Sequence, residues 1–132
     1  MANPNIVNVT SIYAANMGWN LTSGLTDTLL TVSSDVIVKI NTCTCANVNG
    51  TDAADLTLLI DGMATDTTSL GVVPTGQDST IYLAKTVPVP ADDILIVVDR
   101  PIYLMEGDIL KGGASSAGYL DLYIAFEVIN DA

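Results

Sequence analysis

The chain has 132 residues, of which 4 are basic and 15 acidic, giving a formal net charge of -11, and 49% of its residues are hydrophobic. This length fits one domain that can bury a core of its own. The shortage of Lys and Arg argues against nucleic acid as a partner, because contacts to a phosphate backbone need clustered cations.

The composition also favours strands over helices. Val, Ile and Thr total 40 residues, whereas Glu, Lys, Gln and Arg total seven. Side chains branched at the β-carbon fit pleated sheets better than helices. We therefore expect an all-β protein, a single antiparallel β-sandwich domain over residues 1–132 with about 7–9 strands and a jelly-roll or immunoglobulin-like topology.

Alternating and apolar runs place the expected strands along the chain. Turn residues separate them, including Asn-Gly at 49–50, Glu-Gly-Asp at 106–108 and Gly-Gly at 112–113. Residues 62–79 show no periodicity and are expected to form a long loop. The strands are predicted at residues 6–13, 19–21, 28–32, 36–41, 55–60, 80–87, 94–98, 109–111 and 119–129.

The strand nearest the C-terminus has the clearest pattern. Its even-numbered residues are apolar and alternate with a mixed set, which predicts one face in the core and one face outside. The predicted core residues of this strand are Leu120, Leu122, Ile124, Phe126 and Val128.

Two segments near the middle of the chain carry further expectations. Residues 94–98 are apolar throughout, so we expect cover on both faces, by a second sheet on one side and by a loop or another subunit on the other. Residues 87–93 contain two prolines, which donate no backbone hydrogen bond and therefore indicate a corner or an edge strand.

Metal chemistry has little support. The chain has no His, and Cys43 and Cys45 would point to the same side of a strand, so we expect buried or half-buried free thiols and no zinc site. Asp52, Asp55 and Asp61 lack the Asp-x-Asp-x-Asp-Gly spacing of a calcium loop, and turn formation is the preferred reading. We expect no metal and no cofactor.

Catalytic chemistry is equally sparse. Without His, the Ser-His-Asp and Cys-His arrangements are excluded. A carboxylate pair could serve a glycosidase, but such residues in Asp-rich, Gly-rich segments are far more often turn residues. We predict a protein that is not an enzyme and has no small-molecule substrate. The carboxylates considered are Glu106 and Glu127, with Asp61, Asp92, Asp93 and Asp108 as alternatives.

The surface is expected to be under-charged. Charged residues make up 14% of the chain, against roughly 25% in typical globular proteins. Apolar material beyond the needs of one small core predicts a subunit interface and hence a homo-oligomer. No segment reaches 18 uncharged apolar residues, and the first residues lack the pattern of a secretory signal, so we expect synthesis in a cytoplasm and no membrane partner.

Trp19 is the single tryptophan of the chain. Together with exposed tyrosines it could stack on a sugar or anchor a protein interface. Core or interface packing is the preferred reading, because an aromatic ring buries a large apolar area.

Several stretches carry a resemblance to a known family. The chain resembles small virion structural proteins of marine tailed phages, particularly those that infect cyanobacteria, and departs from their pattern at residues 14–24 and 63–77. The stretches that carry the resemblance are residues 3–13 (NPNIVNVTSIY), 48–57 (VNGTDAADLT), 84–92 (AKTVPVPAD) and 102–108 (IYLMEGD), together with the last strand.

The resemblance implies a β-sandwich that coats or extends a virus particle. It implies a capsid decoration protein on the outer surface of the virion, with the major capsid protein as partner and, by analogy with decoration proteins, a trimer. A tail or fibre adaptor is the main alternative, and a carbohydrate-binding adhesin module is the second. The predicted contact elements are the N-terminal arm 1–5, the loop 62–79 and the tryptophan, with Asn3, Pro4, Asn5, Ile6, Trp19, Leu70, Val72 and Val73 as contact residues.

Overall fold

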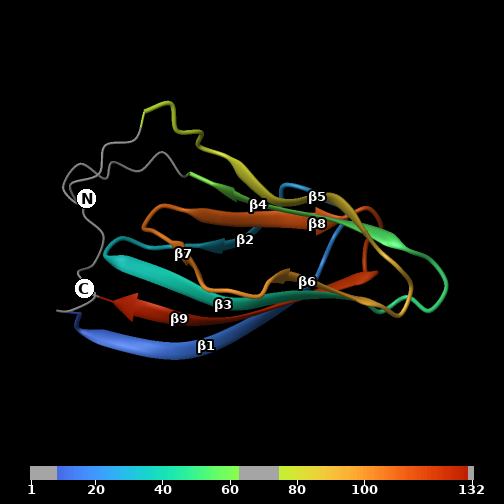
Figure 1. Ribbon diagram of the computed structural model, residues 1–132, viewed down its shortest axis with the longest axis horizontal. Coiled ribbons are helices and arrows are strands. Elements are labelled where there is room, and N and C mark those ends of the chain that lie inside the picture. The colour runs from blue at the N-terminus through green and yellow to red at the C-terminus, as the bar shows by residue number, and fades with distance from the viewer. Residues whose placement is uncertain (1–8, 63–74, 131–132) are drawn as a thin grey trace.

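The computed structural model describes residues 9–62 and 75–130, which form nine strands. The strands make two antiparallel sheets, of five and four strands, packed face to face (Figure 1). This confirms the predicted all-β sandwich. No helix in the described part of the chain could span a membrane. The strands are β1 (Ser11–Asn20), β2 (Thr28–Thr31), β3 (Val36–Asn47), β4 (Ala54–Asp61), β5 (Ile81–Val89), β6 (Ile94–Val98), β7 (Ile102–Leu104), β8 (Ile109–Ala114) and β9 (Leu120–Asn130).

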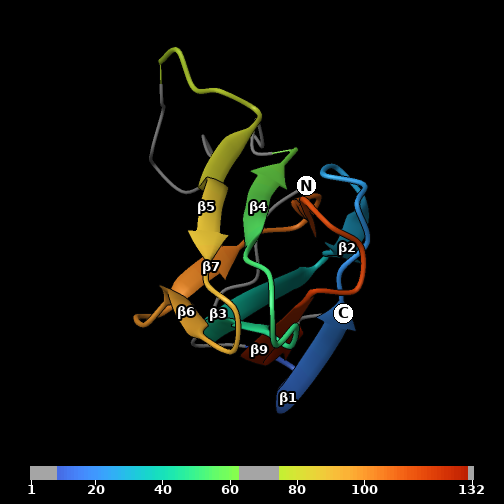
Figure 2. The same cartoon turned by 90° about the vertical axis from the view of Figure 1, so that its right-hand side faces the viewer.

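The strand order shows which elements lie at the edges. The five-stranded sheet runs β1-β9-β3-β6, with β7 also paired to β3, and the four-stranded sheet runs β2-β8-β4-β5. Strand β9 therefore pairs with β1 on one side and with β3 on the other. Figure 2 shows β1 at one margin of the molecule.

The core lies between the two sheets, and β9 contributes four of its side chains. Leu120, Leu122, Ile124 and Phe126 are buried as predicted, whereas Val128 is only half-buried. The four-stranded sheet opposes them with Leu56, Leu58 and Leu110, among others. Burial of each such side chain stabilises the fold by roughly 1.5–3 kcal/mol.

The first strand differs from the sequence-based prediction. Strands were expected at residues 6–13 and 19–21, but the structure has one strand, Ser11–Asn20, paired with β9 in unbroken register. Residues 6–8 lie outside the described part. Nearly all of β1 is exposed on both faces, so its sequence carries no inward and outward alternation. Pairing with β9 makes it a strand, and sequence periodicity does not report that pairing.

Strands β3 and β8 are longer than expected, and β7 was not predicted. Strand β3 runs on to Asn47 because an irregularity between Ile40 and Thr42 shifts its register without ending its pairing with β9. Strand β7 is only three residues long. Strand β5 includes Pro88 and lies at a sheet edge, as the proline-rich stretch predicts.

The Gly-Gly pair at 112–113 was expected to be a turn, and this prediction is wrong. Both glycines lie inside β8. A β-carbon on Gly112 would collide with the carbonyl oxygen of Thr57, and one on Gly113 with the carbonyl oxygen of Gly24. The glycines are therefore needed for close backbone approach.

Cys43 and Cys45 are buried free thiols on the core side of β3, as predicted. Burial, and next the neighbouring Cys45, raises the pKa of Cys43 to about 12. Burial, and next the charge of Asp121, raises the pKa of Cys45 to about 11. Both thiols therefore stay protonated and unreactive at neutral pH.

The central position of β9 gives a stability prediction. Leu122→Ala should lower the free energy of unfolding by about 2–5 kcal/mol, because it leaves a cavity between the sheets. Tyr123→Ala changes the next residue, whose side chain is exposed, and should cost less than about 1 kcal/mol. Urea unfolding followed by tryptophan fluorescence measures both, and equal losses would contradict a core that depends on β9.

Candidate interaction surfaces

Two of the carboxylates considered as catalytic groups, Glu106 and Asp108, bond to the backbone of nearby turns. Glu106 and Asp108 flank the turn between β7 and β8 and are both buried. Glu106 Oε2 accepts a hydrogen bond from the Asp35 backbone N–H at 2.8 Å, and Asp108 Oδ2 accepts one from the Met105 N–H at 2.8 Å. Burial raises the pKa of Asp108, and the Met105 bond opposes that shift. Glu106 thus connects this turn to Asp35, the residue before β3, and Asp108 closes a hydrogen bond within the turn.

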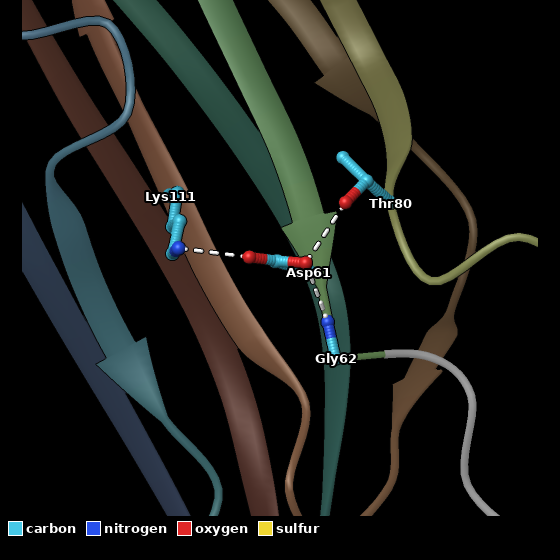
Figure 3. Close-up of polar contacts among 4 residues, drawn as sticks. All are labelled: Asp61, Gly62, Thr80 and Lys111. Carbon is cyan, nitrogen blue, oxygen red and sulfur yellow. Dashed lines mark hydrogen bonds and ion pairs between the residues drawn. The ribbon is translucent and has the colours of Figure 1, made fainter.

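The described residues contain no group of three or more His, Cys, Asp or Glu side chains placed to hold a metal ion. Asp61, one of the acids considered for calcium and for catalysis, is instead the centre of a hydrogen-bonded cluster (Figure 3). Its Oδ2 contacts Lys111 Nζ at 2.8 Å, and its Oδ1 accepts hydrogen bonds from the Thr80 hydroxyl at 2.8 Å and the Gly62 N–H at 2.9 Å. The cluster joins the end of β4 to β8 and to the residue preceding β5.

The cluster predicts a pH dependence of stability. The bond from Lys111, followed by those from Thr80 and Gly62, lowers the pKa of Asp61 from 3.8 to about 2. A lowered folded-state pKa stabilises the protein above about pH 4, and this stabilisation is lost as the pH falls from about 4 to about 2. In Asp61→Asn the thermal midpoint should be lower at neutral pH and fall less over that range. Asp78→Asn, at an exposed position, should keep the wild-type profile in differential scanning calorimetry. Parallel profiles for wild type and Asp61→Asn would contradict the assignment.

One face of the five-stranded sheet points away from the sandwich core. Directly opposite residues of antiparallel neighbours project to the same face, so the register identifies its members. Ile96 lies opposite Thr44, Thr44 opposite Tyr123, and Tyr123 opposite Gly18, which gives one row across four strands. The register thus brings together side chains that are far apart in sequence.

We call this surface the outer face and define it by its exposed large apolar side chains. Ile96 is 61% exposed and Ile94 58%. Charges are few on this face: Lys39 lies opposite Glu127, and Asp121 lies opposite Ala46. At the end of the outer face away from the Tyr123 row, Ile37 and Ile129 are buried, whereas Ile12, which lies opposite Ile129, is exposed. The defining residues are Ile12, Ile94, Ile96, Tyr103 and Tyr123.

The outer face was not identified from sequence, although one signal pointed to it. The apolar run 94–98 predicted cover on both faces. Leu95 and Val97 pack against the core, but Ile94 and Ile96 are exposed in the described single chain. Cover by another subunit or partner therefore stays a prediction for that side.

Strand β1 presents a second apolar surface, on the core side of the same sheet. Tyr13, Ala15 and Met17 lie opposite Val128, Phe126 and Ile124 and so share their face. Nevertheless all three β1 residues are exposed, and Tyr13 is 63% exposed. This surface extends beyond the part of the sheet that the sandwich covers.

Trp19, a predicted contact residue, lies at the end of β1 and is half-buried against the core. It borders two hollows. One, of about 340 Å³, is also lined by Asn20, Asp121 and Tyr123, and the other, of about 190 Å³, by Thr22 and Asp27 among others. Their polar groups bond one another: Asn20 Nδ2 donates to Asp121 Oδ1 at 2.7 Å, and the Thr22 hydroxyl donates to Asp27 Oδ2.

The other predicted contact residues cannot be compared with the structure. They fall in the N-terminal arm and the long loop, and they lie outside the described residues. These are Asn3, Pro4, Asn5, Ile6, Leu70, Val72 and Val73. The structure therefore brings together a different set, centred on β1, β6 and β9.

No protein-family model matches the chain, and no curated protein matches it. The fold and these surfaces define a β-sandwich with apolar side chains gathered on one sheet face.

Proposed function

We propose that the protein is a non-enzymatic structural component of a phage virion, a decoration protein that binds the outer surface of the head and stabilises contacts between capsid subunits. The outer face carries this proposal. Five large apolar side chains are exposed on one side of a single sheet, and such gatherings mark sites of protein association.

The physical properties of the outer face suit a protein partner. Ile94 and Ile96 offer aliphatic area, and the tyrosines pair an apolar ring with a hydroxyl, a combination that is enriched at interfaces. The net charge of -11 is unfavourable for binding to nucleic acid. A weakly charged sheet face can instead lie against the surface of a folded shell, where the major capsid protein is the proposed partner.

Repetition would multiply the effect of each contact. In a symmetric shell the same contact recurs at every equivalent position. A copy that bridges two subunits also gains from effective concentration, because its second contact forms after the first is made. A homo-oligomer, with a trimer favoured by analogy, belongs to this proposal, and attachment to a tail or fibre is its alternative within the virion.

A carbohydrate-binding adhesin is the second candidate, favoured by the surroundings of Trp19. An aromatic ring beside Asn20, Asp121 and Tyr123 combines a stacking surface with groups that bind hydroxyls. In this reading the ligand would be a cell-surface glycan bound beside Trp19 and Tyr123. Ile94 and Ile96, on β6, would not be needed for binding.

Cosedimentation with heads of a tailed phage and with host cells, side by side, distinguishes these functions. We expect saturable binding to heads and none to cells. The double substitution Ile96→Ser with Tyr123→Ser should weaken head binding roughly 10-fold or more, because central apolar residues of an interface often contribute 1–2 kcal/mol each.

The double substitution Ile81→Ser with Tyr82→Ser is the matched control. It removes the same residue types from β5, where they are exposed on the other sheet, and should leave head binding unchanged. Trp19→Ala should also leave it unchanged. Binding to cells alone that is lost in Trp19→Ala would overturn the decoration role in favour of the adhesin. Equal losses of head binding in the two double variants would show that the outer face is not the binding surface.

A further inference from the structure

Strand β1 differs from the other strands at sheet edges. Exposed edge strands are normally short, charged, bulged or interrupted by proline, which prevents unwanted pairing. Strand β2 has four residues, and β6 and β7 have five and three. Strand β5 carries Lys85 and Pro88 and has two register irregularities. Strand β1 has ten residues, an unbroken register, no charge and no proline.

Within the described residues, the backbone of β1 pairs with another strand only on the side of β9. Leu21, just past the strand, donates its N–H to the Leu120 carbonyl at 2.9 Å and keeps the register of the ladder, whereas Thr10, before the strand, donates to the Asn130 carbonyl one residue out of that register. The bond in register sets the alternation of the antiparallel ladder. Odd-numbered residues of β1 therefore direct their backbone groups to β9. Ile12, Ala14, Asn16 and Gly18 direct theirs away, and no strand among the described residues pairs with β1 on that side.

The side chains of β1, like its outward backbone groups, favour pairing with a further strand. Tyr13, Ala15 and Met17 lie on the core side of the sheet and are exposed. An added strand would extend the sheet and would place its own side chains beside these three, so that backbone pairing and apolar contact would form together.

We infer that β1 pairs with β1 of a second copy of this chain, antiparallel and about a two-fold axis. A two-fold contact brings each surface against itself, so any charge near the axis would meet an identical charge. The chain has a net charge of -11, yet residues 9–26 contain no charged side chain. Two copies can therefore approach along β1 without like charges at the axis.

The sequence of β1 is also self-complementary. With the axis at Ala15, Tyr13 lies opposite Met17 of the second copy, and aromatic rings and thioethers attract each other. On the other side of the sheet, Ile12 lies opposite Gly18 of the second copy, so that a large side chain meets a small one. Ala14 and Asn16 of opposite copies exchange backbone hydrogen bonds. The two five-stranded sheets become one continuous sheet.

This inference rests on strand geometry and does not depend on the proposed function. It leaves the outer face of each copy open to a partner. A two-fold pair also differs from the trimer that the resemblance implies, so a mass measurement decides between them.

Multi-angle light scattering on the whole chain is the first test. At about 100 μM, where an interface with a Kd on the order of 1 μM is mostly occupied, we expect twice the 13.8 kDa mass of one chain. Ala14→Pro removes an outward N–H and should give a monomer, whereas Ala14→Ser should stay a dimer. Circular dichroism checks that both variants fold.

A second pair of variants acts through charge and leaves the backbone unchanged. Ala15→Asp places two carboxylates at the axis and should also give a monomer. Its thermal midpoint should equal that of the wild type at dilutions where the wild type is monomeric. Ala15→Ser should remain dimeric. A wild-type monomer or trimer at that concentration would overturn the pairing, as would a dimer that survives both Ala14→Pro and Ala15→Asp. A wild-type monomer whose β1 edge binds an extended strand of another protein would also overturn the pairing, because that strand would take the place of the second copy.

The register is tested by cross-linking. In Ala15→Cys the new thiols of two copies face each other across the axis and should form a disulfide-linked dimer under mild oxidation. Ser33→Cys, at an exposed position away from β1, should cross-link far more slowly. The native thiols do not compete, because Cys43 and Cys45 are buried. Equal cross-linking rates would overturn the assigned axis.

Discussion

The five-stranded sheet depends on the two-sided pairing of β9. One set of its side chains, which includes Leu122 and Ile124, is buried against the other sheet, while its backbone pairs with β1 and β3. A strand that gains apolar burial and two hydrogen-bonded neighbours at once is held in one register, because a slip of one residue would move every core side chain to the outside. The positions of β1 and of the outer face follow from that register.

The same alternation that builds the core also builds the surface. The residues of β9 that point away from the core include Asp121, Tyr123 and Glu127, and the register aligns Tyr123 with Ile96 across β3. An apolar side chain on β6 and one on β9 therefore belong to one face although they are 27 positions apart in the sequence. Because few residues of the chain are charged, apolar area on the outer face is available for association. The composition supports the proposed function in this way.

The sequence predicts those parts of the fold whose signals are local. Strand β9 is predicted from its alternation, β5 as an edge strand from the proline-containing stretch 87–93 at its end, and the burial of Cys43 and Cys45 from their spacing. Strand β1 was misjudged because it is exposed on both faces, so no periodicity records it. Gly112 was read as a turn residue because its real function, close approach to Thr57, concerns a residue on another strand. The outer face could not be predicted for the same reason: it exists only once β6, β3, β9 and β1 are in register.

Hydrogen exchange measured residue by residue by NMR, at low protein concentration, tests most directly whether β1, which pairs only with β9 among the described strands, has one open edge. The β9 amides should exchange only through global unfolding. In β1, the amides of Tyr13, Ala15 and Met17 should be protected, whereas those of Ala14, Asn16 and Gly18 should exchange rapidly. Uniform protection along β1 under these conditions would contradict the open edge, and rapid exchange along β9 would contradict its central place in the fold.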